Sequence, residues 1–146
     1  MAKLARLSKA DPRVRDAANY LIRHVPEKNW RREIAAIFRY VQRCIRYTLD
    51  PHDIELLQSA YVTLKLGYGD CDDKCICLAS LLESVGHPCV FTAMGFGESE
   101  EYSHVIVDVR GAGEGRPIAL DATEPYRIGW RPPGARWIMQ AAIEGR

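Results

Sequence analysis

The chain has 146 residues, of which 47% are apolar and 27% are charged, and its formal net charge at pH 7 is +1. This composition is typical of one globular domain, so it excludes a disordered chain and a collagen-like fibre. No apolar run approaches the roughly 20 residues of a membrane span, and the basic first residues lack the apolar stretch of a signal peptide. We therefore expect a single cytoplasmic domain over residues 1–146, without membrane contact, whose five cysteines are reduced thiols.

Charge is distributed unevenly along the chain. Residues 1–47 carry twelve Lys or Arg and four acids, whereas residues 48–101 carry two Lys and ten acids. The basic residues are spaced along predicted helices and are not clustered with aromatic side chains. We therefore interpret them as solvated helix faces, with a nucleic-acid surface over residues 1–47 as the less favoured alternative.

The segment 1–47 is predicted to be a basic helical segment. Asp11 and Pro12 start one helix, which Pro26 ends. Asn29 can cap a second helix, whose apolar stripe follows at helical spacing.

Two further helices are predicted in the middle of the chain. A short one covers 60–66, with Ser59 as its cap and Gly67 at its end. A longer one covers roughly 71–85 and is apolar on nearly all sides, which predicts a central place in the core.

The hydrophobic period changes to two after the long helix. Residues 89–94, 104–109 and 118–121 each predict a strand, and the tail over 126–146 either adds a last strand or packs as coil. Its last four residues, Ile-Glu-Gly-Arg, match a protease-recognition sequence of expression tags and carry no argument about the fold. Helices followed by antiparallel strands indicate an α+β fold with the helices packed against one sheet.

Three residues form a candidate catalytic set. They are a cysteine at a helix start, a histidine at a strand start and an aspartate at the end of the next strand. These residues are Cys71, His104 and Asp121. A helix N-terminus favours a thiolate, an imidazole can take the thiol proton, and a carboxylate can fix the imidazole tautomer. Adjacent antiparallel strands can bring His104 and Asp121 side by side, so the pattern is typical of a nucleophilic thiol site.

The same segments resemble the transglutaminase-like superfamily of papain-type fold. The resemblance covers about residues 50–130 and lies in three motifs, which read Gly69-Asp70-Cys71-Asp72-Asp73, Ser103-His104-Val105-Ile106-Val107 and Leu120-Asp121-Ala122-Thr123. It implies that Cys71 is the nucleophile, His104 the general base and then acid, and Asp121 the orienting group. Val105 departs from the pattern, because many members have an aromatic residue directly after the histidine.

The resemblance implies a papain-like α+β domain and thiol-dependent acyl chemistry on peptide or amide bonds of a peptide or protein substrate. Water as the second nucleophile would give hydrolysis and an amine would give transamidation, and small microbial members favour hydrolysis slightly. The doubled aspartate after the cysteine is similar to phage and prophage members, which would make the protein virion-associated. The alternative is a scaffold or phage-assembly protein that retains the fold without the chemistry.

An acyl intermediate requires hydrogen-bond donors for its oxyanion. The backbone N–H of Cys71 is one, and Gln58 is the candidate for the second, with Tyr68 as the runner-up. An ordinary loop amide is an equal interpretation of Gln58. Asp70 can cap the helix, whereas unscreened acids near Cys71 oppose a thiolate that a protonated His104 favours.

The remaining cysteines are interpreted as core residues. Cys75, Cys77 and Cys89 lie in apolar surroundings, and Cys77 points away from the helix face that Cys71 and Cys75 share. Three thiols so arranged cannot meet at one metal ion. The first-turn acids Asp72 and Asp73 could bind calcium, but the helix dipole alone explains them, so we predict no metal and no cofactor.

Overall fold

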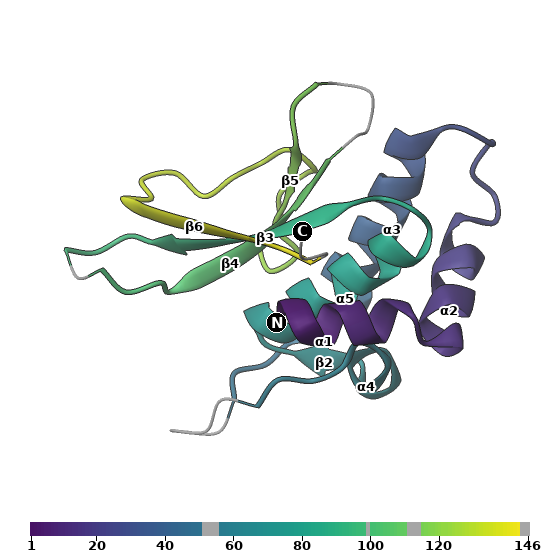
Figure 1. Cartoon of the computed structure of the whole chain (residues 1–146), viewed down its shortest axis with the longest axis horizontal. Helices are drawn as coiled ribbons and strands as arrows, with labels where there is room; N and C mark the ends of the chain where they lie inside the picture. Colours follow the sequence, from purple (N-terminus) through teal and green to yellow (C-terminus); the bar gives the residue numbers. More distant parts are fainter. Residues whose placement is uncertain (51–55, 99, 111–114, 144–146) are drawn as a thin grey trace.

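The computed structural model describes residues 1–50, 56–98, 100–110 and 115–143 (Figure 1). Within these residues the helices are α1 (Ala2–Lys9), α2 (Pro12–Ile22), α3 (Trp30–Cys44), α4 (Ala60–Leu66) and α5 (Cys71–Ser84), and the strands are β1 (Arg46–Tyr47), β2 (Tyr68–Gly69), β3 (Cys89–Gly95), β4 (His104–Val109), β5 (Ile118–Leu120) and β6 (Trp137–Ala142). Figure 1 shows the helices gathered on one side of the four-stranded sheet. The predicted α+β class is confirmed. No helix among the described residues has both the length and the hydrophobicity to cross a membrane.

Local capping signals start the helices where the sequence predicts them. The Asp11 side chain accepts from the backbone N–H of Arg13, and the Asn29 side chain accepts from that of Arg32. Ser59 caps α4 in the same way, and Gly67, with φ of 72°, ends it. The starts of α2, α3 and α4 and the end of α4 are therefore determined by residues within a few positions of each terminus.

Helix α1 was not predicted, because Met1 gives it no side-chain cap. Long-range contacts hold it instead. Ala5 is fully buried, and its carbonyl accepts from the Ser80 hydroxyl at 3.4 Å. The Ser8 hydroxyl accepts from the backbone N–H of Ala60 at 3.2 Å. The helix thus depends on residues far along the chain, which local sequence patterns do not reveal.

Helix α5 lies in the middle of the core, as its all-round hydrophobicity predicts. It contacts the other four helices of the described chain and strands β3 and β4. Four large side chains along it are fully buried: Ile76, Leu78, Leu81 and Leu82. Burial on every side fixes α5 against both layers, so its first residue has a defined position relative to the sheet.

The main sheet is antiparallel with the order β5-β4-β3-β6. Phe91 lies opposite Val107, which lies opposite Leu120, and these three side chains share the face that packs on the helices. The tail forms β6, which settles the alternative between strand and coil. Its Met139 lies opposite Ala93.

The opposite face of the sheet holds the tail through a buried carboxylate. Asp108 is 1% exposed and accepts from Thr92 at 2.5 Å and from Arg131 at 2.6 Å. Gln140 of β6 donates to the Thr92 hydroxyl at 3.1 Å. These bonds connect β3, β4 and β6 with the loop that precedes β6, so the position of β6 is determined by polar contacts as well as by its ladder.

A buried lysine joins α5 to the end of α3. Lys74 is 2% exposed, and its ammonium donates to the carbonyl oxygens of Ile45 at 2.7 Å and Gln42 at 3.4 Å. Burial lowers the pKa of Lys74. The ammonium satisfies carbonyl groups that the end of α3 leaves without a helical partner.

Replacement of Lys74 by methionine should destabilise the fold. Lys74→Met keeps the aliphatic stem but leaves buried carbonyls without a donor, so we expect a loss of about 2 kcal/mol in the free energy of unfolding. Urea denaturation measures it. Lys65→Met, in the last turn of α4, is the matched control, and equal losses in the two variants would contradict the role of the buried ammonium.

Candidate active site

A cavity of about 470 Å³ opens where the first turn of α5 faces the sheet. Both Cys71 and His104 line it. The other lining residues come from the chain start, from the first turn of α5, from β3, from the segment that leads into β4 and from β6: Met1, Ala2, Asp70, Asp72, Phe91, Ala93, Tyr102, Ser103, Val105, Met139 and Ala141. The cavity therefore brings together distant parts of the chain around one thiol and one imidazole.

The helix start that carries Cys71 is fixed by a reciprocal pair of hydrogen bonds. The Asp70 carboxylate accepts from the backbone N–H of Asp73 at 3.0 Å, and the Asp73 carboxylate accepts from that of Asp70 at 3.3 Å. A Cβ on Gly69 would lie 2.5 Å from the Cβ of Asp73, so only glycine fits there. The predicted cap by Asp70 is confirmed, and Cys71 is the first residue of α5.

His104 is bound to Asp121, as the strand positions predict. The His104 Nε2 lies 2.7 Å from the Asp121 Oδ2. The other carboxylate oxygen of Asp121 accepts from the backbone N–H of Thr123 at 3.0 Å and from its hydroxyl at 2.7 Å. Asp121 is 3% exposed, so Thr123 fixes the carboxylate and the carboxylate fixes the imidazole.

His104 and Asp121 shift each other's pKa values. Hydrogen bonds to Asp121 and to Cys71 raise the pKa of His104 from 6.5 to about 10, against the effect of burial. Burial opposes the charge on Asp121, but hydrogen bonds from His104 and Thr123 outweigh it and lower the pKa of Asp121. Both shifts favour the charged form of the pair, an imidazolium and a carboxylate, at neutral pH.

Asp72 places a negative charge near the thiol. Its Oδ1 lies 4.0 Å from the Cys71 Sγ. This carboxylate opposes a thiolate, whereas the imidazolium of His104 and the helix N-terminus favour one. Asp73 is fully buried under the helix start, where it caps backbone N–H groups.

The other thiols do not compete for this chemistry. Cys75, Cys77 and Cys89 are buried in the core, which confirms their predicted role. Burial raises the pKa of Cys77 to about 12 and the pKa values of Cys75 and Cys89 well above their usual range. Cys44 is exposed and lies at the end of α3, away from the residues that line the cavity.

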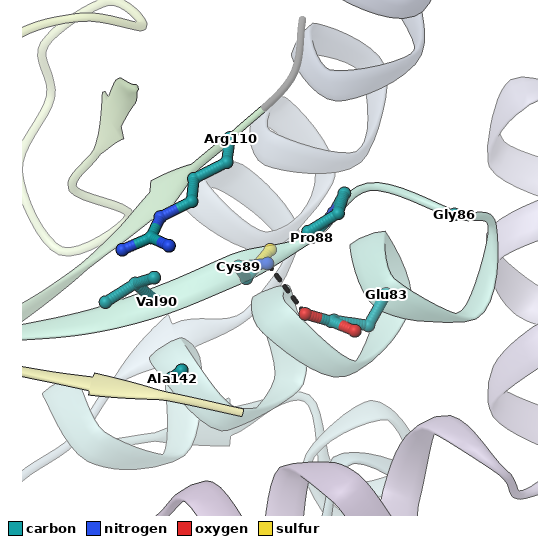
Figure 2. Close-up of a pocket in the computed structure, with 7 residues that line it drawn as sticks. All are labelled: Glu83, Gly86, Pro88, Cys89, Val90, Arg110 and Ala142. Atoms are coloured by element: carbon teal, nitrogen blue, oxygen red, sulfur yellow. Dashed lines mark hydrogen bonds between the residues drawn. The ribbon is translucent and has the colours of Figure 1, made fainter. Parts of the chain in front are cut away.

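A larger hollow of about 720 Å³ lies near the other end of α5 (Figure 2). Glu83 in its wall accepts from the backbone N–H of Cys89 at 2.6 Å and pairs with Lys9 at 3.0 Å. The Cys89 thiol donates to the carbonyl of His87 at 3.2 Å. Glu83 and the Cys89 thiol are thus already engaged within the protein, and we assign the candidate site to the cavity at Cys71.

The structure does not bring the predicted oxyanion donors to the cavity. Gln58 donates its backbone N–H to Asp73 at 2.7 Å, and its side-chain oxygen accepts from the Thr63 hydroxyl at 3.3 Å. Tyr68 lies in β2 with 37% of its surface exposed. Neither residue is part of the cavity lining. Gln58 instead supports the helix start through the carboxylate of Asp73.

Tyr47 lies near the start of α5, although it is not part of the cavity lining. It lies opposite Gly69 in the short parallel ladder of β1 and β2, next to the segment that leads into Cys71. Burial and the charges of Cys71, Asp70 and Asp72 raise the pKa of its hydroxyl. The only sequence signal was a short extended segment at residues 46–48, because the pairing partner is distant in sequence.

Three carboxylates beside the helix start can hold a metal ion. One oxygen each of Asp50, Asp70 and Asp73 lies within 4.8 Å of the other two. Burial and the charges of Asp70 and Asp50 raise the pKa of Asp73. An all-carboxylate donor set suits a hard cation such as Ca²⁺, and the repulsion within the cluster would be relieved by one. The sequence analysis missed this set because Asp50 is remote from the other two in sequence.

Comparison with solved structures shows a shared fold. A provisionally assigned protease from Parabacteroides distasonis has a TM-score of 0.69 and 14% identity over 99% of this chain, which spans 29% of that protein. Calcium-bound LapG from Legionella pneumophila has a TM-score of 0.64 and 22% identity over 92% of this chain and 79% of its own. A provisionally assigned cysteine protease from Cytophaga hutchinsonii has a TM-score of 0.59 and 14% identity over 92% of this chain and 52% of its own.

The sequence itself matches a family over most of its length. No curated protein sequence matches the chain. Residues 15–138, however, match the Transglutaminase-like superfamily, and this range includes Cys71, His104 and Asp121. The fold and the family match agree with the resemblance seen in the three sequence motifs, and the chain belongs to the transglutaminase-like superfamily.

Proposed function

We propose that the chain is a thiol-dependent hydrolase of peptide or amide bonds. Cys71 is the nucleophile, His104 the general base and acid, and Asp121 the group that orients His104. The observation that carries the proposal is the 2.7 Å bond between His104 and Asp121 at the wall of a cavity that Cys71 also lines. The provisional assignment of two fold neighbours as proteases, one of them a cysteine protease, supports hydrolysis.

The reaction begins when the Cys71 thiolate attacks the substrate carbonyl carbon. The carbonyl oxygen takes up the negative charge and is held by the backbone N–H of Cys71 at the helix start. The intermediate collapses to a thioester, and the imidazolium of His104 gives its proton to the leaving amine. Water then attacks the thioester and His104 takes a proton from it. The carboxylic acid leaves, and the Cys71 thiolate and the His104 imidazolium are restored.

The raised pKa of His104 bears on which of its roles is favoured. At about 10 it keeps the imidazole protonated at neutral pH, which suits donation to a poor amine leaving group. An amine in place of water would give transamidation from the same thioester.

Thiol alkylation tests the nucleophile. At pH 7, iodoacetamide should label Cys71 roughly tenfold or more faster than the exposed Cys44, because the imidazolium and the helix start favour the thiolate. Peptide mapping of the same sample measures both rates, so Cys44 is an internal reference. His104→Gln should bring the Cys71 rate down to that of Cys44. If Cys71 and Cys44 are labelled at equal rates, and His104→Gln leaves the Cys71 rate unchanged, the result would favour a scaffold protein without thiol catalysis.

Product analysis separates hydrolysis from transamidation. Fluorescein-labelled casein should be cleaved by the unaltered chain and left intact by Cys71→Ala, because no other thiol lines the described cavity. Incorporation of dansylcadaverine into casein without cleavage would instead identify an amine as the second nucleophile.

The pair of His104 and Asp121 should make stability depend on pH. A pKa raised from 6.5 to about 10 on folding contributes stability that is fully present below pH 6.5 and is lost as the pH rises through about 10. The free energy of unfolding should therefore fall more steeply from pH 7 to 10 in the unaltered chain than in Asp121→Asn. Urea denaturation at several pH values measures the slopes. His24→Gln, at an exposed position, should keep the unaltered slope.

We further propose that Ca²⁺ binds Asp50, Asp70 and Asp73. Two observations support this site: the oxygen cluster itself and the calcium-bound form of the fold neighbour LapG. The ion would offset the repulsion that raises the pKa of Asp73 and would hold Asp50 against the helix start. Its role would be to position the segment that carries Cys71.

Calcium should raise the melting temperature, and EGTA should reverse the rise. At roughly a hundred times the dissociation constant, the stabilisation expected from binding to the folded state alone is about 2.7 kcal/mol. Asp50→Asn should remove most of the shift. Asp72→Asn also removes one negative charge near the start of α5, but Asp72 is not part of the cluster, so this variant should keep the shift in melting temperature. Loss of the shift in both variants would indicate a nonspecific charge effect.

A further inference from the structure

Strand β6 is an exposed and uncharged edge of the main sheet. It is the last strand in the order β5-β4-β3-β6, and within the described residues no strand pairs with its outer side (Figure 1). Its sequence is Trp-Ile-Met-Gln-Ala-Ala, without charge or proline, and all six residues are exposed. Proteins usually protect such an edge with a charge, a proline or a bulge, because its free N–H and C=O groups can pair with another chain.

The edge is continuous with the candidate active site. Met139 and Ala141 line the cavity that Cys71 and His104 line. Met139 lies opposite Ala93, and Ala141 lies opposite Phe91, so these side chains share the cavity face of the sheet. Since side chains alternate along a strand, Ile138 points to the other face. A strand added to β6 would thus place every second side chain on the face that leads to the thiol.

We propose that β6 binds the substrate as an added β-strand, a proposal that rests on the function proposed above. The occupant is an extended, uncharged peptide segment with small or apolar side chains, held by main-chain hydrogen bonds to the outer side of β6. Asp72 in the cavity wall adds a charge criterion, because it repels acidic side chains next to the bond that is cleaved.

Substrate pairing explains the edge better than pairing with a second copy of the chain. The exposed apolar residues do not form an isolated patch but continue into the cavity through Met139 and Ala141. The strand is also anchored on its inner side, where Gln140 donates to Thr92 and Arg6 donates to the carbonyl of Ile143, just past the strand. A rigid strand whose side chains reach the cavity is suited to hold a peptide in one register.

A peptide reagent tests the pairing directly. Acetyl-Val-Ala-Val-Ala chloromethyl ketone is extended and uncharged, and the Cys71 thiolate displaces its chloride to form a thioether. Two isomers, N-methylated at successive residues, lack one amide hydrogen each. A strand directs alternate amides toward its neighbour. One isomer should therefore alkylate Cys71 about fivefold to tenfold more slowly than the parent, the loss expected for one hydrogen bond, and the other should not. Equal rates for all three reagents, or equal losses for both isomers, would overturn the proposal.

Two substitutions on β6 form a matched pair for the side-chain contribution. Met139→Lys places a charge on the cavity face and Ile138→Lys places it on the other face, at residues that are 52% and 56% exposed. Each peptide rate is divided by the iodoacetamide rate of the same variant, which corrects for changes in the thiol itself. The ratio should fall at least about tenfold for Met139→Lys and less than about threefold for Ile138→Lys. Equal falls would contradict docking on the cavity face.

Failure of the docking proposal and failure of the proposed function give different results. If iodoacetamide labels Cys71 no faster than Cys44, the enzyme proposal fails, but fluorescence anisotropy of the dye-labelled peptide amide and its N-methylated isomers still measures pairing. A concentration-dependent dimer that Met139→Lys abolishes and the peptide amide does not displace would overturn the docking proposal and assign the edge to a second copy of the chain.

Discussion

The reciprocal hydrogen bonds between Asp70 and Asp73 determine where the thiol lies. They end the extended segment at Asp70 and begin α5 at Cys71, and the hydrophobic residues that follow bury the helix on all sides. Gly69 is part of the same constraint, since a side chain there would collide with Asp73. A shift of the sequence by one residue along α5 would rotate the position of the thiol by about 100° around the helix axis. The backbone N–H groups of the same turn would be the oxyanion donors in the proposed reaction.

This helix start has an electrostatic cost. Asp70, Asp72 and Asp73 are favourable for the helix dipole and its orphan N–H groups, yet all three oppose a thiolate at Cys71. The imidazolium of His104 provides the opposite charge, and it remains protonated because Asp121 is buried and held by Thr123. The acids fix the position of the Cys71 thiol and the positive charge of His104 offsets their repulsion, so the two requirements are met by different elements, α5 and the β4–β5 pair.

The features that could be predicted from the sequence are those with local causes. Asp11, Asn29 and Ser59 cap helices through bonds that span two or three residues, and Gly67 ends a helix through its own φ angle. The strand positions of His104 and Asp121 followed from hydrophobic alternation and a hairpin connection, which is why their pairing could be anticipated. The fold class followed from the same order of elements.

The features that were missed depend on contacts between distant segments. Helix α1 has no cap of its own and is held by Ser80 and Ala60. Gln58 had the residue type of an oxyanion donor, but its side-chain oxygen bonds to Thr63, and its backbone bonds to Asp73. Tyr47 approaches the start of α5 through the two-residue ladder of β1 and β2, and Asp50 approaches it in the acidic cluster. The hydrophobic periodicity of the sequence reveals neither contact.

Strand β3 connects these observations, because it lies between β4 and β6 in the sheet. On one side it fixes β4, which starts at His104, and on the other it fixes β6, whose Met139 and Ala141 reach the same cavity. Any displacement of β6 relative to His104 would have to break a ladder or the polar contacts of Thr92 and Asp108. An exposed apolar edge ordinarily invites aggregation, so its retention beside a thiol and an imidazole is best explained if a peptide covers it during the reaction.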